Sequence, residues 1–484
     1  MDLLLKLCTK SYNAQKWSDE SKAAFQSLFG SSGGRYEKRA KKDIQFRTPN
    51  FTSSSNVPFS AIIHDSNPSS GGYSGMSFVI FPVEEDEAMI AMVVGTQGLS
   101  PDENIIGKPG HSRKMNALTS WINSEYQGNE LIAWSKRDAV RTDLSVPENI
   151  QSAFPKFRDV FKKYGGVIYG FCIAKPDIAD KALKAFLDFH FEERGYLPLT
   201  AAQKEAEAIK RKYFTHLMPT VNRESVHDLL IKRKYVILQG PPGTGKTRLA
   251  NELLNEKYEN RGMVIQFHPN ITYENFIGGL FPQSTGSDLG LNFQISRGHL
   301  LNAVVKALQT EKDVLLVIDE INRADLSKVL GEAIYGLEPY EKRTIQLPYD
   351  FGEPIGKELQ FPPNLHILGT MNTADRSIAI LDVAIRRRFA FLNMWPQSEV
   401  VNQFGNKTTK DAYHKLLSIF IEYASEDAFN LMPGHSYFIA QENVDVAKQM
   451  KTNLLPLLNE YMIQGYVANF ADAIHAYMQE IEQL

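Results

Sequence analysis

The pattern of apolar and polar positions up to about residue 195 predicts a domain that mixes strands and helices. Strand-like apolar stretches lie at 58–63, 77–83, 88–94 and 166–173, and helical periodicity lies around 113–126 and 177–194. The acidic turn EEDE at 84–87 predicts that the stretches on either side of it pair as a hairpin. We therefore expect an α+β domain at the start of the chain.

The pattern changes near residue 197. A charged helical stretch at about 200–218 predicts a linker helix, and apolar strand-like runs then alternate with helices. These runs are VILQG at 236–240, VIQFH at 264–268, VLLVID at 314–319 and LHILGT at 365–370. Such alternation is typical of an α/β domain whose parallel sheet is covered on both faces. After residue 395 the pattern is helical and predicts a small lid.

The predicted boundaries are 1–196 for the α+β domain, 197–222 for the helical linker, 223–395 for the α/β domain and 396–484 for the helical lid. A chain of 484 residues agrees with more than one domain.

Composition narrows the class of protein. Only two cysteines are present, Cys8 and Cys172, which argues against a disulfide scaffold and against a thiolate zinc site. The net charge of −3 gives no general sign of a nucleic-acid binder. Apolar stretches stay shorter than the roughly 18–20 residues that cross a bilayer. The sequence therefore predicts a cytoplasmic protein without a membrane segment.

The segment GPPGTGKT at 240–247 matches the phosphate-binding pattern G-x-x-x-x-G-K-[ST] between a predicted strand and a predicted helix. Its glycines allow the backbone N–H groups to turn toward phosphates, and the following helix adds positive potential at its N-terminus. Lys246 would reach the β- and γ-phosphates, and the Thr247 hydroxyl would bind Mg²⁺. The predicted nucleotide-binding residues are Gly240, Pro241, Pro242, Gly243, Thr244, Gly245, Lys246 and Thr247.

A second motif supports the same chemistry. Asp319 and Glu320 end the apolar run at 314–319, and open α/β sheets place their ligands at this end of their strands. Asp319 would bind Mg²⁺, and Glu320 would polarise the water that attacks the γ-phosphate. Together the two motifs predict a P-loop nucleoside triphosphatase.

Longer runs resemble the McrB group of AAA+ proteins, the GTP-driven subunits of modification-dependent restriction systems. The similar runs are VIQFHPNITYENFIGGLFP at 264–282, DEINRADLSKVLGEAIYGLEPYEKR at 319–343, GTMNTADRSIAILDVAIRRRFAF at 369–391 and HSYF at 435–438. This resemblance covers roughly residues 225–445 and implies an AAA+ fold with a parallel sheet and a helical lid.

The resemblance also implies roles for further residues. Asn372 would act as sensor 1 on the γ-phosphate or the lytic water, and Arg386 or Arg387 of the run Arg386–Arg388 would act as an arginine finger in a neighbouring subunit. The alternative for these arginines is a basic helix end that complements its dipole. Residues expected to position Glu320 or to shape the subunit interface are Asn322, Arg323, Asp375 and Arg376.

A finger acting in trans implies a ring, usually a hexamer in this family. The resemblance favours GTP over ATP, although the residues themselves do not distinguish the two bases. We expect residues ahead of the phosphate-binding loop, around His227–Leu230, to contact the base. His268, Tyr273 and Phe276 could line the ring interior, but aromatic residues of this kind are more often packing. His435 is expected to be a hydrogen-bonded structural histidine.

In the McrB group the N-terminal domain selects the target, often a modified DNA base, and a separate McrC-type subunit carries the nuclease. The candidate pocket aromatics are Tyr73, Trp121, Tyr126 and Trp134, and the nearby basic residues are Lys108, Arg113, Lys114 and Arg137. The polar run at 95–114 predicts a binding loop. The alternative is that these aromatics belong to the core. No strong nuclease motif is present, so we expect cleavage to belong to another chain.

Two other functions stay open at this stage. An ATP-driven remodelling chaperone of the related MoxR type would share the phosphate-binding loop and the acidic strand, although MNTADRS followed by RRRF fits the McrB group better. A nucleotide-gated scaffold would not need turnover, and the presence of Glu320 and Asn372 argues against it.

Overall fold

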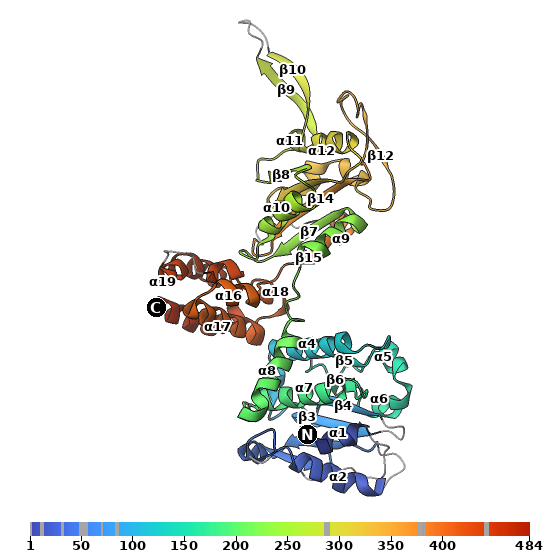
Figure 1. The fold of residues 1–484 in the computed structure, drawn as a ribbon, viewed down its shortest axis with the longest axis vertical. Coiled ribbons are helices and arrows are strands. Elements are labelled where there is room, and N and C mark those ends of the chain that lie inside the picture. The colour runs from blue at the N-terminus through green and yellow to red at the C-terminus, as the bar shows by residue number, and fades with distance from the viewer. Residues whose placement is uncertain are drawn as a thin grey trace. The chain divides into compact units, whose positions relative to one another are not determined.

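The computed structural model describes residues 2–9, 14–30, 33–47, 57–68, 71–82, 87–284, 291–375, 381, 383–439 and 445–484. The chain divides into two compact units, each with a sheet of its own (Figure 1). The first unit comprises Met1–Met218 with Ser418–Ser425, and the second comprises Pro219–Leu417 with Glu426–Leu484. The four-part division expected from the sequence stays a prediction.

The first unit is built on a six-stranded antiparallel sheet. In spatial order its strands are β1 (Ile44–Arg47), β2 (Ser60–His64), β3 (Met76–Pro82), β4 (Ala88–Val94), β6 (Ile168–Ile173) and β5 (Ala133–Ser135). β3 and β4 pair from Pro82 opposite Ala88, as the hairpin prediction requires, while residues 83–86 of the predicted turn lie outside the described residues.

Helices cover both faces of this sheet, which explains why every position of β3, β4 and β6 is buried. One face carries α1 (Asp2–Thr9), α4 (Pro109–Glu125) and α7 (Ala179–Glu192), and the other carries α5 (Glu148–Ala153), η2 (Pro155–Phe157) and α6 (Arg158–Tyr164). The unit also contains α2 (Ala14–Gln26), η1 (Lys38–Asp43), α3 (Glu103–Ile106) and α8 (Thr200–Phe214).

Half of the binding loop expected at 95–114 is helical, so that prediction is wrong for this half of its length. The segment contains α3 and the first turns of α4. Its glycines and prolines suggested a loop, but Pro109 begins α4, where proline needs no hydrogen-bond partner for its nitrogen.

The second unit is built on a five-stranded parallel sheet, which confirms the predicted α/β fold with an antiparallel-sheet region before it. In spatial order its strands are β15 (Ala390–Asn393), β7 (Tyr235–Gly240), β14 (Leu365–Asn372), β11 (Val314–Asp319) and β8 (Gly262–Gln266). β15 was not predicted, because four residues that end in asparagine carry little strand signal.

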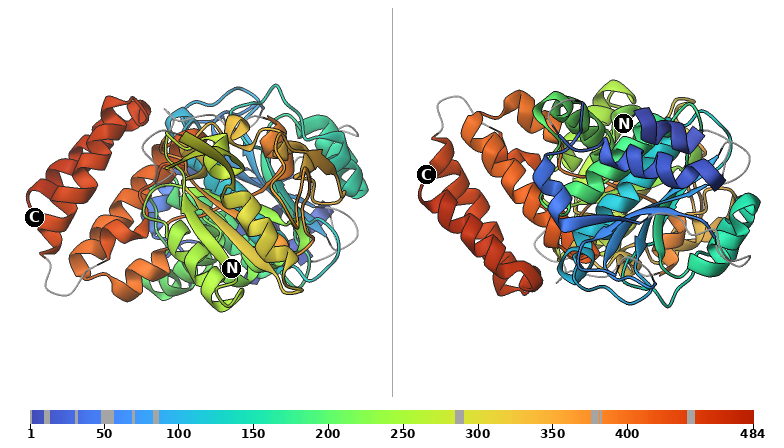
Figure 2. Two further views of the ribbon diagram at one scale, coloured as in Figure 1. Left: turned by 90° about the horizontal axis from the view of Figure 1, so that it is seen from above. Right: turned by 90° about the horizontal axis from the view of Figure 1, so that it is seen from below.

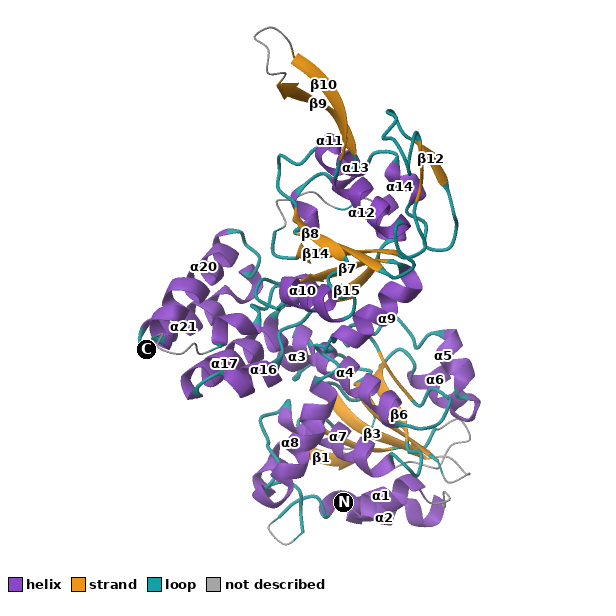
Figure 3. Cartoon of the chain, turned by 45° about the horizontal axis from the view of Figure 1, so that its top comes forward, coloured by secondary structure: helices purple, strands orange, loops and turns teal. Residues whose placement is uncertain are grey.

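Alternate residues of the central strands enter two separate cores. Val236, Leu238 and Val317 pack with α9 (Arg223–Arg233) and α10 (Lys246–Glu256) on one face. Their neighbours in sequence pack on the opposite face with α12 (His299–Leu308) and α13 (Leu326–Leu330). Figure 3 shows helices on both sides of this sheet. Burial on both faces accounts for the nearly continuous apolar strands of the sequence.

Two hairpins interrupt the α/β pattern, and neither was predicted. β9 (Gly278–Ser284) pairs with β10 (Leu291–Arg297) and extends away from the parallel sheet, and β12 (Thr344–Gln346) pairs with β13 (Glu358–Gln360) (Figure 1). Short helices between the strands are α11 (Tyr273–Phe276), η3 (Ile321–Arg323), α14 (Ala333–Gly336) and α15 (Val383–Arg388).

The chain after β15 is helical throughout the described residues, as expected for a lid. Figure 2 shows these C-terminal helices, coloured orange to red, packed side by side. They are α16 (Ser398–Phe404), α17 (Lys407–Tyr423), α18 (Glu426–Phe429), η4 (His435–Phe438), α19 (Val446–Gln449), η5 (Met450–Leu454), α20 (Leu455–Ile463), η6 (Ala468–Phe470) and α21 (Ala471–Glu482). Among the described residues, no helix has the length and apolar character to cross a membrane.

Candidate active site

The phosphate-binding loop joins β7 to α10, and its glycines are required by its geometry. Gly243 and Gly245 have φ angles of 80° and 83°, in the left-handed region that side chains disfavour. A Cβ atom on Gly240 would lie 2.2 Å from the carbonyl oxygen of Met394. The loop therefore depends on glycine at three positions, and its turn directs the N-terminus of α10 toward the carboxyl edge of the sheet.

Lys246, the first residue of α10, is folded into the loop. Its Nζ donates to the carbonyl oxygens of Gly240 at 2.9 Å and Pro241 at 2.8 Å, and it is 9% exposed. Burial lowers the pKa of Lys246 to about 8, against the opposing effect of the nearby carboxylates. Thr244 is also buried and closes the turn by donating to the same Pro241 carbonyl.

Three side chains and a backbone amide form one hydrogen-bonded chain across α10, β11 and β14. Asp319 Oδ1 accepts from the hydroxyls of Thr247 at 2.7 Å and Thr370 at 2.6 Å. The Thr370 oxygen in turn accepts from the backbone N–H of Glu320 at 3.1 Å. The structure thus brings together the predicted Thr247, Asp319 and Glu320, and it adds Thr370, which the sequence did not indicate.

Glu320 adopts an unusual backbone conformation at the end of β11. Its φ of 55° lies in the left-handed region, which is uncommon for a residue with a side chain and concentrates at functional sites. Burial raises the pKa of the Glu320 carboxyl, and Arg323, whose Nε lies 3.5 Å from Glu320 Oε2, opposes this shift. Raising the pKa makes the carboxylate a stronger base.

Buried oxygen atoms without a hydrogen-bond partner gather beside this chain. Among the described residues they include Oε2 of Glu320 and Oδ1 of Asn322 and of Asn372. Asn372 pairs in register with Gly240, and Asn322 Nδ2 lies 3.4 Å from the Asn372 carbonyl. Buried acceptors normally have partners, so atoms of this kind are suited to a ligand or to water. Asp375, which lies 3.6 Å from Arg323, belongs to the same group.

The predicted finger arginines lie on α15 and have different surroundings. Arg386 is exposed, and its Nε donates to the Leu381 carbonyl at 3.3 Å. Arg387 is 67% exposed along its side chain, whereas Arg388 is 8% exposed; both lie 3.2 Å from Oε1 of Glu338. Arg376, expected at the subunit interface, lies outside the described residues.

A loop of the C-terminal helical region packs on the phosphate-binding loop. The backbone N–H groups of Gly434 and Ser436 donate to the carbonyls of Pro242 at 2.9 Å and Gly243 at 3.1 Å. A Cβ atom on Gly434 would lie 2.0 Å from Gly243, so only glycine fits there.

His435, in the same loop, is a half-buried, hydrogen-bonded histidine as expected. Its Nδ1 accepts from the backbone N–H of Gln397 at 3.3 Å, and burial lowers its pKa to about 4. His227, from the stretch expected to contact the base, contacts Tyr258. Tyr258 in turn bonds His366 at the amino-terminal end of β14. The phosphate-binding loop lies at the opposite ends of these parallel strands, so the geometry gives no support to base contact by His227.

Two of the four aromatic residues proposed for a target pocket in the first unit are buried in its core. Trp121 is 2% exposed and Tyr73 is 8% exposed, and Trp134 packs on Phe171 with ring centroids 5.9 Å apart. Tyr126 is half-buried. The structure therefore favours the core interpretation for Tyr73 and Trp121.

Two of the basic residues expected beside that pocket are also buried. Arg113 donates to the carbonyls of Ile421 at 2.7 Å and Ala424 at 2.6 Å, both in the segment Ser418–Ser425 of the same unit. Lys114 forms ion pairs with Glu193 and Glu422. Both side chains bind groups within the protein and are therefore poorly placed to bind a nucleic acid. Arg137, in contrast, is exposed.

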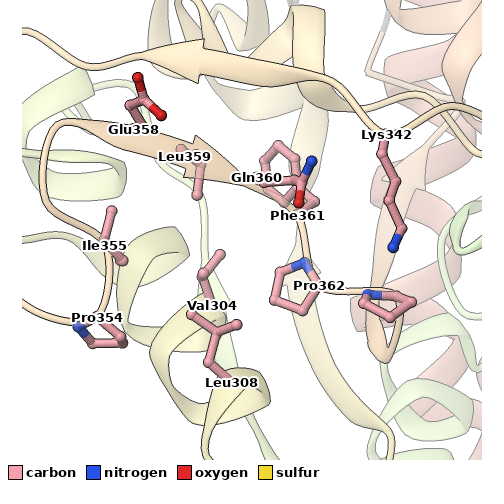
Figure 4. Close-up of a pocket in the computed structure, with 11 residues that line it drawn as sticks. Val304, Leu308, Lys342, Pro354, Ile355, Glu358, Leu359, Gln360, Phe361 and Pro362 are labelled. Carbon is pink, nitrogen blue, oxygen red and sulfur yellow. The ribbon is translucent and has the colours of Figure 1, made fainter.

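A cavity of about 220 Å³ lies elsewhere in the second unit, and Figure 4 shows the side chains that line it. Val304 and Leu308 of α12 face Leu359 and Phe361, and the wall continues to Pro363 just before β14. The cavity therefore lies at the opposite end of β14 from Asn372 and forms no part of the candidate active site.

Comparison with known proteins agrees with this site. Residues 235–389 match the family described as AAA domain (dynein-related subfamily). The chain is 35% identical over 351 residues to the type IV methyl-directed restriction enzyme EcoKMcrB subunit of Escherichia coli K12, covering 65% of this chain and 75% of that protein. It is 26% identical over 189 residues to the type II restriction enzyme BsuMI component YdiS of Bacillus subtilis 168, covering 32% of this chain and 55% of that protein.

A solved structure of a RuvB mutant from Thermotoga maritima is also similar, with 17% identity, 54% of this chain and 70% of that chain covered, and a TM-score of 0.22. A score this low supports no further argument. The identity to the Escherichia coli protein, the family match over the parallel sheet and the geometry of the phosphate-binding loop agree with one another. The chain belongs to the McrB family of restriction-enzyme subunits, and its second unit contains an AAA nucleoside triphosphatase domain.

Proposed function

We propose that this chain is the GTP-hydrolysing motor of a restriction system that acts on modified foreign DNA. The observation that supports hydrolysis most strongly is the hydrogen-bonded chain from Thr247 through Asp319 and Thr370 to Glu320. It links the residue that would bind metal to the residue that would activate water, so the two are held in a fixed relation beside the phosphate-binding loop.

The loop would bind the triphosphate. Backbone N–H groups of residues 240–247 and the N-terminus of α10 favour phosphate oxygens, and the Lys246 ammonium would exchange its two carbonyl partners for them. Thr247 and Asp319 have the oxygen ligands that suit Mg²⁺, Asp319 acting through bound water. Bound Mg²⁺ supplies charge neutralisation on the β- and γ-phosphates.

Glu320 would accept a proton from the attacking water, and Asn372 would orient that water or the γ-phosphate. Oε2 of Glu320 and Oδ1 of Asn372 are buried and accept no hydrogen bond, which supports these roles. The raised pKa of Glu320 supports the first role, because a carboxylate that binds a proton more tightly is a stronger general base.

The subunits would form a ring, expected to be hexameric, in which an arginine of α15 reaches the site of a neighbour. Arg386 and Arg387 are the candidates because both are exposed at the end of a short helix. The proposed parts of the chain are target recognition in 1–196, the linker in 197–222, nucleotide binding in 223–395 and the lid in 396–484.

Membership of the McrB family supports two further parts of the proposed system, a nuclease subunit and DNA recognition. A separate McrC-like subunit would dock on the ring and carry the nuclease, and the first unit would recognise DNA in the cytoplasm, where both would defend the cell against foreign DNA. The burial of Arg113 and Lys114 means that any DNA-binding surface must use other residues.

The decisive experiment is hydrolysis of GTP and ATP side by side by the purified full chain, with Lys246→Ala as the blank. We expect GTP to be preferred and the variant to be inactive and unable to assemble in response to nucleotide. Equal or preferred use of ATP would contradict the GTP proposal and favour a protein-remodelling motor. Normal nucleotide-dependent rings from Lys246→Ala would contradict the role of the loop.

A further inference from the structure

Glu338 lies after α14, and three arginines converge on its carboxylate. Oε1 of Glu338 is 3.2 Å from the nearest guanidinium nitrogen of Arg343, of Arg387 and of Arg388. Arg343 comes from the same stretch of chain, whereas the other two come from α15. The Glu338 side chain is 16% exposed, so water competes little for this oxygen.

The three arginines are held to different degrees. Arg388 is 8% exposed and also donates to the Ala384 carbonyl at 2.9 Å, so it is fixed in the body of the unit. Arg343 binds a second carboxylate, Glu341, at 2.6 Å. Arg387 is 67% exposed, and Glu338 is its ion-pair partner. Glu338 thus joins a buried, fixed guanidinium to an exposed one.

The charges of this cluster do not balance. Three guanidiniums meet two carboxylates, Glu338 and Glu341, which leaves one positive charge over within the cluster. The excess charge lies closest to solvent at Arg387, because this arginine is the most exposed and shares its carboxylate with two others. An exposed guanidinium whose charge is only partly compensated is suited to bind an anionic group supplied from outside the subunit.

Arg386 has a different setting. Its Nε donates to the Leu381 carbonyl, and its guanidinium lies 5.6 Å from the centre of the Phe391 ring. Neither contact is made to a carboxylate, so among its described contacts Arg386 lacks the ion pair that Arg387 has.

We propose that Glu338 is a positioning residue that holds Arg387 outward at the end of α15, and that Arg387 is the guanidinium presented to the triphosphate of a neighbouring subunit. This proposal rests on the proposed hydrolytic function. An arginine without such a restraint samples many rotamers, and ordering it in the transition state would cost conformational entropy. Glu338, itself braced by Arg388, removes most of that freedom before the subunits meet.

The first test is a double-mutant cycle on GTP turnover by the full chain. Arg387→Ala is expected to reduce turnover by about 10³-fold or more, the usual scale for a finger arginine. Glu338→Gln is expected to reduce turnover by about tenfold without changing the affinity for a fluorescent GTP analogue. The double variant should be no slower than Arg387→Ala alone, because Glu338 acts through that arginine. If the double variant lost turnover by the product of the two single losses, the proposal would be overturned.

The control for this cycle is Glu358→Gln, the same change at an exposed carboxylate of β13 that bonds Gln346. Its turnover should equal that of the unmodified chain. Should Glu338→Gln fail to fold, Glu338→Asp keeps the charge and shortens the side chain, and it should show a smaller loss with the same lack of additivity.

The second test assigns the defect to one side of the subunit interface. Subunits with Glu338→Gln have an intact nucleotide site, and subunits with Glu320→Gln have intact α15 arginines. Mixing the two should restore GTP turnover above either alone, as should mixing Arg387→Ala with Glu320→Gln. If the mixture with Arg387→Ala recovered turnover while the mixture with Glu338→Gln did not, Glu338→Gln would have damaged the nucleotide site of its own subunit. That result would overturn the positioning role. Recovery by neither mixture would contradict the arrangement in trans and with it the proposal.

The unmodified chain separates this inference from the proposed function. Absence of turnover by that chain would contradict the hydrolytic function itself. Normal turnover by both the unmodified chain and Glu338→Gln would contradict only the role of Glu338.

Discussion

Lys136 in the first unit and Lys246 in the second are buried to a similar degree and donate to the same kind of partner. Lys136 is 7% exposed and donates to the carbonyls of Arg141 and Gly166, and Lys246 is 9% exposed and donates to those of Gly240 and Pro241. Burial lowers the pKa of each to about 8. Burial, hydrogen-bond partners and pKa therefore do not show which of the two lysines belongs to a functional site.

The two lysines differ in what lies around them. Lys246 stands at the carboxyl edge of a parallel sheet, beside Asp319 and Glu320 and near unpartnered oxygens. Lys136 follows an edge strand of an antiparallel sheet and ties two loops of the same unit together. A buried charge thus indicates a functional site when polar groups without partners accompany it, and a structural tie when its partners are already complete.

The largest effect is expected at Glu320. Glu320→Gln should lower GTP turnover by about 10³-fold or more, because an amide cannot accept the proton of the attacking water. Nucleotide affinity should persist, since the loop and Lys246 are intact. Turnover and equilibrium binding of a fluorescent GTP analogue, measured on one preparation, check both statements. Unchanged turnover would mean that the parallel-sheet edge is not catalytic and would favour the nucleotide-gated scaffold.

A comparably large effect on stability is expected in the first unit. Asp188 accepts from Arg35 at 2.6 and 2.7 Å and from Tyr36 at 2.6 Å, with both members of the ion pair buried. Asp188→Ala leaves the buried Arg35 charge with Glu205, 2.9 Å away and 47% exposed, as its remaining ion-pair partner. The variant should lower the free energy of unfolding of this unit by about 3–5 kcal/mol. Thermal unfolding followed by circular dichroism checks this.

The second unit provides the control for Asp188→Ala. Its unfolding transition, identified by its shift on addition of GTP, should stay within about 0.5 kcal/mol of the original. A large loss of stability in both units would contradict the expectation that Asp188 stabilises the first unit alone.

A smaller effect separates the two lysines directly. Lys136→Met keeps the length of the side chain but leaves the Arg141 and Gly166 carbonyls without their buried donor, which should cost about 1–3 kcal/mol of stability. GTP turnover by the folded protein should stay unchanged. A loss of turnover greater than the loss of folded protein would contradict a purely structural role for Lys136.

The smallest effect concerns pH. Lys246 is charged below its pKa of about 8 and neutral above it, and only the charged form attracts phosphate. The affinity for a non-hydrolysable GTP analogue should be level from pH 6.5 to 7.5 and fall by up to about tenfold as pH rises from 8 to 9. In Lys246→Arg the guanidinium stays charged, so its affinity should not fall over this range. An equal fall in both proteins would assign the titration to another group.

The sequence predicted the strands that are buried on both faces well and the hairpins of the second unit poorly, for physical reasons. Strands buried on both faces form continuous apolar runs, and β7, β11 and β14 are each preceded or followed by turn or helix signals. The β9–β10 hairpin was missed because glycine, proline and glutamine interrupt its alternation.

The candidate site shows the same division. Its motif residues were predictable because the spacing of glycines, Lys246 and Thr247 has a direct geometric meaning. Thr370 was missed because a single threonine in a strand has no signature; only the pairing of β14 beside β11 brings it to Asp319.

The burial of the charged residues Arg35, Asp188 and Arg113 in the first unit could not be predicted from the sequence either. Arg35 and Asp188 are 153 positions apart, and Arg113 meets carbonyls more than 300 residues later in the chain. Lysine and arginine are mostly exposed in proteins, so a sequence with basic residues near aromatic ones suggests a binding surface unless tertiary partners are known.

The contact between Gly434 and Gly243 has a mechanical consequence. Two backbone hydrogen bonds join the phosphate-binding loop to residues 434–436, and the two segments lie too close together to admit even a methyl group on Gly434. A rearrangement of the loop must therefore either break both bonds or carry the start of η4 with it. The second course keeps both bonds, so a shift of the phosphate-binding loop would be transmitted through η4 to α16 and η5, which pack against it.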